Sequence, residues 1–339
     1  PLNPSYKSEE YEFYLKDLNP KIVLVEKNSE NPVVDVVKKL KIELCEINPE
    51  KDGPSGIFNI YEKESEYSLP DESDEALVLH TSGTTSRPKI VPLTNKNIFS
   101  SAENISKSLN LSNNDHCLNI MPLFHIHGLI AILASSMKAG ASVCASNGFN
   151  AIKFLDLAKS EKITWYSGVP TMHQTILLRA HRNLEIAKGL KLRLIRSSSA
   201  SLPPAVFNDL NDVFSCPVIE AYGMTEATHQ MTSNPLPPKQ QKAGFVGLPA
   251  GPEVCIMNEN GEVLKQGDEG EVCIKGENVT VGYDNNEEAN KTSFTNGWFR
   301  TGDQGYFDKE GYLKISGRLK EIINKGGEKI SPLEVDNVL

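Results

Sequence analysis

A loop rich in hydroxyl-bearing residues and followed by a lysine is the strongest candidate for phosphate chemistry in this sequence. It reads Thr81-Ser82-Gly83-Thr84-Thr85-Ser86-Arg87-Pro88-Lys89. Backbone N–H groups and hydroxyls in such a loop can approach phosphate oxygens, while Arg87 and Lys89 offset the negative charge. The loop differs from the Gly-x4-Gly-Lys-Ser/Thr phosphate loop, because it holds one glycine and its lysine follows a proline. An exposed Ser/Thr-rich turn is the alternative interpretation.

A second group of chemically capable residues is Tyr222-Gly223-Met224-Thr225-Glu226. It follows a predicted strand over 217–220, where ligand-facing loops stand in α/β folds. The Tyr222 ring could stack on a nucleotide base, and the Thr225 hydroxyl could bind a phosphate oxygen. Glu226 offers a hard oxygen ligand of the kind that Mg²⁺ takes. The alternative is an ordinary helix start with an acid in its first turn.

A third group joins an aspartate to an arginine across a predicted pair of strands. Asp303 ends the segment Trp298-Phe299-Arg300-Thr301-Gly302-Asp303, and Arg318 lies in Gly317-Arg318-Leu319-Lys320. A carboxylate can accept hydrogen bonds from both hydroxyls of a ribose, and a guanidinium can reach the same sugar or a phosphate. The alternative is a single surface ion pair between the two side chains, which would contribute little stability.

Alternating strand and helix patterns over the first 234 residues must position these groups, and they predict parallel α/β layers. Asn95 is expected to cap a helix over 96–109, and the small apolar stretch 128–139 is expected to be a packed helix. Beyond Pro235 the pattern changes to short alternating runs, which predict antiparallel strands. These runs cover 253–257, 262–264, 270–275 and 311–315.

Composition limits the partners of the chain. The net charge of −9 argues against nucleic acid or an anionic membrane surface, because both select basic proteins. Six cysteines lie without C-x-x-C spacing, which favours reduced thiols in an intracellular compartment over a zinc site or a disulfide framework. No apolar run has the length of a membrane span. The chain begins without methionine and stops inside an apparent helix, so we expect a fragment.

The three groups together resemble the motifs of the adenylate-forming enzymes, which include acyl-CoA synthetases, luciferases and nonribosomal-peptide adenylation domains. Their phosphate loop usually reads Ser/Thr-Ser-Gly-Ser/Thr-Thr-Gly-x-Pro-Lys-Gly, and here Ser86 and Ile90 replace its later glycines. The resemblance covers essentially the whole chain. Asn234-Pro235-Leu236-Pro237 and the segment 318–332 are most similar to the oxalate–CoA ligase branch found in plants and fungi.

The resemblance implies a fold and a domain layout. The fold is α/β, the large N-terminal domain of adenylate-forming enzymes, with layered αβαβα subdomains and a small antiparallel β-barrel-like subdomain. Residues 1–234 would form the layered part with the ATP and acyl sites, and 235–317 the small β subdomain. Residues 318–339 would hold a hinge and the start of a C-terminal domain. A further family lysine that contacts the acyl carboxylate would lie past Leu339.

The resemblance also implies a reaction with ATP, Mg²⁺ and coenzyme A. A carboxylate attacks the α-phosphorus of ATP to give an acyl-adenylate and pyrophosphate, and the coenzyme A thiol then displaces AMP. Lys89, His125, Thr225 and Glu226 would be catalytic, with Glu226 as the Mg²⁺ ligand. Lys320 would be the hinge, and Gly326 and Gly327 would help form the coenzyme A tunnel. The implied ATP-binding residues are Thr81, Ser82, Gly83, Thr84, Thr85, Lys89, Ser199, Ala200, Glu220, Ala221, Tyr222, Thr225, Asp303 and Arg318.

The acyl pocket is expected to be small and polar. Ligases of aromatic or fatty acids usually carry a Gly-Gly-Ala or Gly-Ala-Ala turn where this chain has Arg196-Ser197-Ser198-Ser199-Ala200-Ser201. The added hydroxymethyl groups narrow a cavity and supply hydrogen-bond donors. A protonated histidine would add a counter-charge for the second carboxylate of oxalate. The expected pocket residues are His125, His127, Ser198, Ser199 and His229.

Two alternatives stay open at this point. A coumarate- or fatty-acyl-type ligase would need a long apolar pocket, and a catalytically inactive nucleotide-binding homologue would retain the motifs without the reaction. The compartment is expected to be the cytosol or the peroxisome, and any targeting tripeptide would lie past Leu339.

Overall fold

The computed structural model describes residues 1–49, 56, 58–59, 68–81, 88–321, 323–325, 328–330 and 332. The chain divides into two compact units, Pro1–Leu69 and Pro70–Leu339. The boundary predicted at residue 234 falls inside the second unit. The division into subdomains at that point therefore stays a prediction.

The first unit is a small α/β layer. Strands β1 and β2 pair in parallel with α2 between them in the chain, and β3 pairs antiparallel with β2. Helices α1 and α2 contribute Tyr11, Leu15 and three valines to its core. The elements are α1 (Ser8–Leu18), β1 (Ile22–Glu26), α2 (Val33–Leu40), β2 (Glu43–Pro49) and β3 (Phe58–Asn59).

The second unit is built on a seven-stranded sheet with the strand order β12-β11-β10-β9-β8-β6-β7. The strands are β6 (His116–Asn119), β7 (Ser142–Ala145), β8 (Trp165–Gly168), β9 (Leu194–Ser197), β10 (Val218–Met224), β11 (His229–Ser233) and β12 (Leu248–Pro249). Strands β7, β6, β8, β9 and β10 run parallel, and β11 and β12 are antiparallel to their neighbours. The chain passes outward from β6 to β7 and returns to β8 on the other side of β6. In open α/β sheets, ligands bind outside the carboxyl ends of the strands at such a switch.

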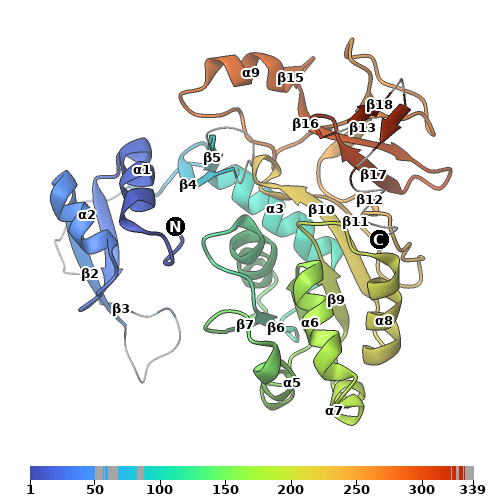
Figure 1. Ribbon diagram of the computed structural model, residues 1–339, viewed down its shortest axis with the longest axis horizontal. Helices are drawn as coiled ribbons and strands as arrows, with labels where there is room; N and C mark the ends of the chain where they lie inside the picture. The colour runs from blue at the N-terminus through green and yellow to red at the C-terminus, as the bar shows by residue number, and fades with distance from the viewer. Residues whose placement is uncertain are drawn as a thin grey trace. The chain divides into compact units, whose positions relative to one another are not determined.

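Successive residues of each strand point to opposite faces of the sheet and therefore enter two different cores. Trp165 and Leu194 enter one core, which α3 and η1 cover, whereas Tyr166 and Ile195 enter the other, which α5, α6 and α8 cover (Figure 1). The helices are α3 (Asn95–Ser108), the π-helix η1 (His127–Ala134), α4 (Ser135–Lys138), α5 (Ala151–Ser160), α6 (Pro170–Ala180), α7 (Leu184–Gly189) and α8 (Pro204–Phe214). None of the helices in the described part of the chain is long and apolar enough to span a membrane.

A second, antiparallel sheet follows in the sequence and confirms the expected change of pattern. Its strand order is β13-β14-β16-β15, and β17 also pairs with β16. The strand predicted over 262–264 is wrong, because Val263 forms only an isolated bridge with Met257. Two short hairpins complete the unit, β4 with β5 and β18 with β19. The remaining elements are β4 (Glu75–His80), β5 (Ile90–Thr94), η2 (Thr225–Ala227), β13 (Glu253–Met257), β14 (Gly270–Lys275), α9 (Glu287–Ser293), β15 (Phe294–Thr295), β16 (Trp298–Phe307), β17 (Leu313–Arg318), β18 (Ile323–Lys325) and β19 (Glu328–Ile330).

The start of α3 corrects one local prediction. Thr94, rather than Asn95, caps this helix. Its hydroxyl accepts from Asn97 N at 3.2 Å, and Asn97 Oδ1 accepts from Thr94 N at 2.9 Å. The two bonds form a reciprocal capping box, which gives the backbone N–H groups of Thr94 and Asn97 an acceptor.

The Tyr-Gly-Met segment corrects a second prediction. It is not a loop after a strand, because β10 continues through Tyr222, Gly223 and Met224 and pairs with β11, a strand that the sequence pattern did not indicate. The two backbones approach so closely that a Cβ atom on Gly223 would lie 1.9 Å from the carbonyl oxygen of His229. Glycine is therefore required at this position.

Candidate active site

The phosphate loop connects the two strands of a hairpin. Thr81 and Lys89 close its base, because Thr81 N donates to Lys89 O at 2.9 Å and Lys89 N donates to Thr81 Oγ1 at 3.1 Å. Ser82, Gly83, Thr84 and Thr85, which we expect to bind ATP, lie outside the described residues. Their ATP-binding role therefore stays a prediction. The hairpin fixes Lys89 at the exit of the loop.

Lys89 and Glu226 share a neighbour, Tyr283. The Tyr283 hydroxyl donates to Glu226 Oε1 at 2.7 Å, and Lys89 Nζ lies 4.3 Å from the centroid of the Tyr283 ring. Burial raises the pKa of Glu226, and Tyr283, Lys89 and Arg318 oppose that rise. Burial lowers the pKa of Lys89, and the nearby charge of Lys320 lowers it further, whereas Glu226 opposes the change. The sequence motifs did not reveal Tyr283.

The carboxylate of Glu226 suits a magnesium ion by its donor type. It is 6% exposed at the short helix η2, directly after Thr225. Mg²⁺ prefers carboxylate, hydroxyl and phosphate oxygens, and it commonly binds through one or two carboxylates plus a substrate phosphate. A bound Mg²⁺ would neutralise phosphate charge at this position, and Glu226 would hold it.

A second group consists of Tyr222, Asp303 and Arg318. Strand register places Asp303 and Arg318 side by side. Asp303 on β16 faces Arg318 on β17, and Arg318 Nε lies 2.9 Å from Asp303 Oδ1. The Tyr222 hydroxyl donates to the other carboxylate oxygen. Burial raises the pKa of Asp303, and Tyr222 and Arg318 oppose that rise. Asp303 is buried while Arg318 is exposed, so this is not the plain surface pair of the alternative interpretation.

The turn after β9 carries Ser199 and Ala200, two of the predicted ATP-binding residues, and both are exposed. Glu220 supports this turn from β10, since its Oε1 accepts from Leu202 N at 3.0 Å. Glu220 is 1% exposed, and its Oε2 has no hydrogen-bond partner among the described residues. Burial raises the pKa of Glu220 to about 7. The Glu220 carboxyl is therefore partly protonated at neutral pH.

This raised pKa predicts a pH-dependent contribution to stability. The folded chain retains the Glu220 proton up to about pH 7, whereas the unfolded chain releases it near 4.5. Stability from Glu220 is therefore full below the unfolded pKa and is lost as pH rises through the folded pKa. Relative to Glu220→Gln, the free energy of unfolding should fall by about 3 kcal/mol across this window and then level off. Urea unfolding of both proteins from pH 4.5 to 8 measures the difference, and parallel curves would contradict it.

The histidines and serines expected in the acyl pocket come together, with different roles. His127 is fully buried, with Nδ1 3.0 Å from Ser199 Oγ and Nε2 2.6 Å from Ser167 Oγ. The rings of His127 and His229 have centroids 5.0 Å apart, and His127 N donates to His125 Nδ1 at 3.2 Å. The sequence did not indicate Ser167. These contacts show one connected polar group.

The structure corrects two expectations for the acyl pocket. Ser198 is buried, and its hydroxyl donates to Ala221 O at 2.8 Å, so it braces β9 against β10. The expectation of a protonated histidine is wrong for His127 and His229. Burial holds the pKa of both far below the usual range, and the charge of Arg196 lowers it further. Both rings are therefore neutral at physiological pH.

The buried cation beside these rings is Arg196, which the sequence indicated only as the first residue of the serine-rich turn. It lies in β9 and is 0% exposed. Its Nη2 donates to Gln230 Oε1 at 3.1 Å and lies 3.5 Å from His229 Nδ1, and its Nη1 lies 3.4 Å from Ser167 Oγ. The available signal was an arginine directly after the apolar residues Leu194 and Ile195.

Comparison with known proteins gives the family. A family model described as "AMP-binding enzyme" matches residues 1–284. The chain belongs to the AMP-binding enzyme family. The resemblance inferred from the motifs is thereby confirmed, and so is the α/β fold class.

Among relatives of this AMP-binding enzyme, the oxalate–CoA ligase of Arabidopsis thaliana is 49% identical over 100% of this chain and 67% of its own length. The oxalate–CoA ligase of Saccharomyces cerevisiae is 42% identical, again over 100% of this chain and 67% of its own length. ATP-bound MatB from Rhodopseudomonas palustris has a TM-score of 0.87 and 29% identity, covering 99% of this chain and 66% of its own. The chain thus spans about two thirds of the length of these relatives.

The remaining predicted site residues lie near the end of the chain. Lys320, the predicted hinge, is exposed in the turn that follows β17. Gly326 and Gly327, predicted for the coenzyme A tunnel, lie outside the described residues. The hinge and tunnel roles stay predictions.

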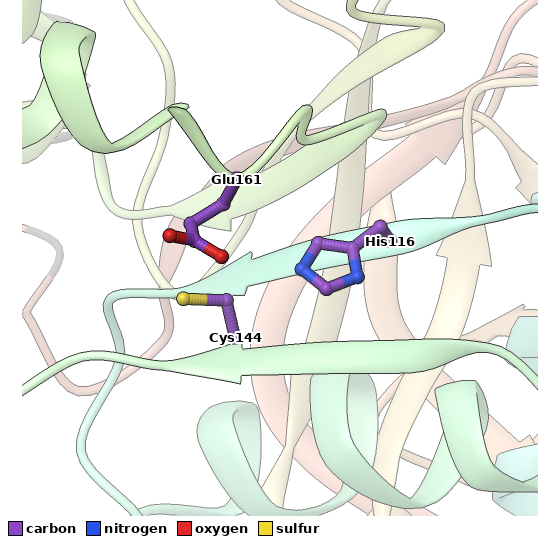
Figure 2. A group of neighbouring side chains, drawn as sticks. All are labelled: His116, Cys144 and Glu161. Carbon is purple, nitrogen blue, oxygen red and sulfur yellow. The ribbon is translucent and has the colours of Figure 1, made fainter. Parts of the chain in front are cut away.

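A separate group of possible metal ligands is His116, Cys144 and Glu161 (Figure 2), whose ligand atoms lie within 4.8 Å of one another. His116 Nδ1 contacts Ser142 Oγ at 2.5 Å, and Figure 2 shows the other ring nitrogen on the side of Cys144 and Glu161. Nitrogen and sulfur ligands suit zinc, whereas Mg²⁺ takes oxygen ligands. His116 is the first residue of β6, whereas the segment that carries His125 and His127 follows the other end of this strand. This group therefore does not suit the magnesium of an ATP reaction, and the role of Glu226 as the Mg²⁺ ligand stays a prediction.

Proposed function

We propose that this AMP-binding enzyme is the ATP- and acyl-binding part of an AMP-forming acid–CoA ligase, with oxalate as its substrate. In the first half-reaction a carboxylate oxygen bonds to the α-phosphorus of ATP, and pyrophosphate leaves. In the second the coenzyme A thiol bonds to the acyl carbon, AMP leaves, and the thiol proton is released.

The observation that supports the nucleotide half is the meeting of two polar groups in one compact unit. Lys89 and Glu226 meet around Tyr283, where a lysine charge and a magnesium ligand would face the phosphates of ATP. Asp303 and Arg318 would bind the ribose, beside the ring of Tyr222. Positioning and charge stabilisation are the main contributions to phosphoryl transfer. MenE of Bacillus subtilis, solved with ATP and magnesium, is 29% identical with a TM-score of 0.82, which supports the same ligands here.

The polar character of the acyl pocket favours oxalate. His127, His229 and Ser199 offer hydrogen-bonding groups where a coumarate- or fatty-acyl-type ligase would need apolar walls. The plant and yeast relatives are oxalate–CoA ligases, and they cover the whole of this chain. Coumarate- or fatty-acyl-type ligase activity is the second candidate, and an inactive homologue is the third.

Three further assignments belong to the same proposal. Lys320 acts as the hinge between the two half-reactions, and Gly326 and Gly327 contribute to the coenzyme A tunnel. The enzyme acts on small molecules in the cytosol or the peroxisome, with no nucleic acid as partner.

ATP–pyrophosphate exchange on the full-length protein tests the proposal. The panel of acids is oxalate, malonate, 4-coumarate and octanoate, each with Mg²⁺, and coenzyme A is then added to detect the thioester. We expect exchange with oxalate and at least tenfold less with the others. Exchange with 4-coumarate or octanoate alone would establish the second candidate. ATP binding without exchange on any acid would establish the third.

A further inference from the structure

Arg196 is a buried charge whose hydrogen-bond partners among the described residues are all neutral. Its guanidinium contacts Gln230, Ser167 and His229, and its Nε has no hydrogen-bond partner in the part of the chain that the structure describes. Among the ion pairs of the described residues, none includes Arg196, whereas nearby Arg193 is paired with Asp115 at 2.9 Å. A buried cation without a counter-ion is costly to keep. The protein therefore holds a charge that its own described residues do not neutralise.

The hydrogen bonds of Arg196 fix the proton positions on both pocket histidines. A guanidinium has donors only, so the His229 Nδ1 atom that it contacts must be the acceptor. The proton of neutral His229 then lies on Nε2. Ser167 Oγ also accepts from Arg196, and its own hydroxyl proton is left to donate to His127 Nε2.

The same reasoning continues to the exposed turn. With Nε2 as acceptor, neutral His127 carries its proton on Nδ1 and donates to Ser199 Oγ. Ser199 then keeps its hydroxyl proton for another partner, and it is exposed after β9. In each hydrogen bond between Arg196 and Ser199, the donor is therefore the group nearer to the guanidinium. An array of donors that ends at an exposed hydroxyl suits an anion.

We infer that Arg196 is the specificity-determining cation of the acyl pocket, and that it recognises the second carboxylate of a short dicarboxylic acid by orienting His127, His229 and Ser199 as donors. The inference rests on the proposed function for its substrate. Arg196 acts through the two histidines and is thus a positioning residue. It supplies the positive charge that the neutral histidines cannot, and it explains why a second charge could be accepted in a buried place.

The experiment compares two acids of nearly equal shape, oxalate and oxamate, in which a neutral amide replaces the second carboxylate. Arg196→Met removes the charge, and Arg196→Lys retains it. Arg193→Lys is the matched control, because Arg193 precedes the same strand but has Asp115 as its partner. Values of kcat/KM for adenylation are measured for each acid on the full-length variants.

We expect Arg196→Met to lower kcat/KM for oxalate by about 10- to 150-fold, the range for losing one hydrogen bond to a charged group, because a donor that Arg196 orients would no longer face the second carboxylate. Its kcat/KM for oxamate should fall less than about threefold, so the preference for oxalate collapses. Arg196→Lys should keep part of the preference, and Arg193→Lys all of it. An equal fall for both acids, or an unchanged preference, would overturn the inference.

A second measurement separates this inference from the proposed function. Histidine-selective ¹⁵N NMR of the wild-type chain reports which ring nitrogen carries the proton. We expect Nε2–H at His229 and Nδ1–H at His127, with His229 changing or mixing tautomers in Arg196→Met. If wild type adenylates neither acid but shows these tautomers and binds oxalate more tightly than oxamate in calorimetry, the proposed reaction fails and the inference stands. Opposite tautomers in wild type would overturn the inference even in an active oxalate ligase.

Discussion

Glu226→Gln is expected to reduce acyl-adenylate formation by about 100- to 1000-fold, the range for removing one group that stabilises charge in a transition state. The amide keeps the shape of the side chain, and its oxygen can still accept from the Tyr283 hydroxyl, so the fold should survive. What is lost is the negative charge of the proposed Mg²⁺ ligand. Single-turnover formation of the adenylate measures the effect, and thermal unfolding checks the fold.

Tyr283→Phe is the matched control for this prediction, because it keeps the carboxylate but removes its hydrogen bond. Tyr283 opposes the rise that burial imposes on the pKa of Glu226, so its loss should raise that pKa further. In the proposed role the ionised carboxylate is the active form, so the acidic limb of the pH–rate profile should move to higher pH. In Glu226→Gln this limb should be absent. A normal adenylation rate in Glu226→Gln would remove Glu226 from the site.

Asp303→Asn is expected to raise KM for ATP by about 10- to 150-fold, since hydrogen bonds to a charged acceptor are stronger than those to a neutral amide. Asp303 is buried between the Tyr222 hydroxyl and the Arg318 guanidinium, which contact different carboxylate oxygens. In asparagine the amide oxygen can still accept from Arg318, and the amide NH2 group can donate to the Tyr222 oxygen. The substitution therefore changes charge more than shape. Steady-state kinetics with varied ATP at saturating acid measure the change.

ATP analogues that lack one ribose hydroxyl test the assignment of Asp303 to the ribose. Wild type should discriminate strongly against 2′-deoxy-ATP and 3′-deoxy-ATP, whereas Asp303→Asn should discriminate much less. If the variant kept the full wild-type discrimination, Asp303 would act on the fold through Arg318 rather than on the sugar. A thermal unfolding midpoint close to that of wild type is the control for such a structural effect.

The sequence determined the family, the α/β class and most of the individual elements. Those features depend on residues close together in the chain. The phosphate loop, the Tyr222–Glu226 segment and the strands around Asp303 are each contiguous, so their residue types alone indicate chemistry. The helix predicted over 96–109 is observed as α3 (Asn95–Ser108) for the same reason.

Local patterns were less informative where two segments compete or pair. Asn95 and Thr94 are both good caps. The hydrogen bond that Thr94 N donates to Asn97 Oδ1 decided between them. The strand character of Tyr222 to Met224 depends on β11, which lies across a turn and has no alternating apolar pattern. Pairing partners of this kind are chosen by tertiary structure.

The electrostatics of the acyl pocket were decided only by the fold. His127, Arg196 and His229 lie far apart in the sequence, and each alone would be an ordinary titratable residue. The fold brings them together and buries all three, which disfavours charge on the histidines and leaves the guanidinium as the cation. Tyr283 meets Glu226 in the same way, across 57 residues. Burial and proximity change a side chain's chemistry, and neither is a property of the local sequence.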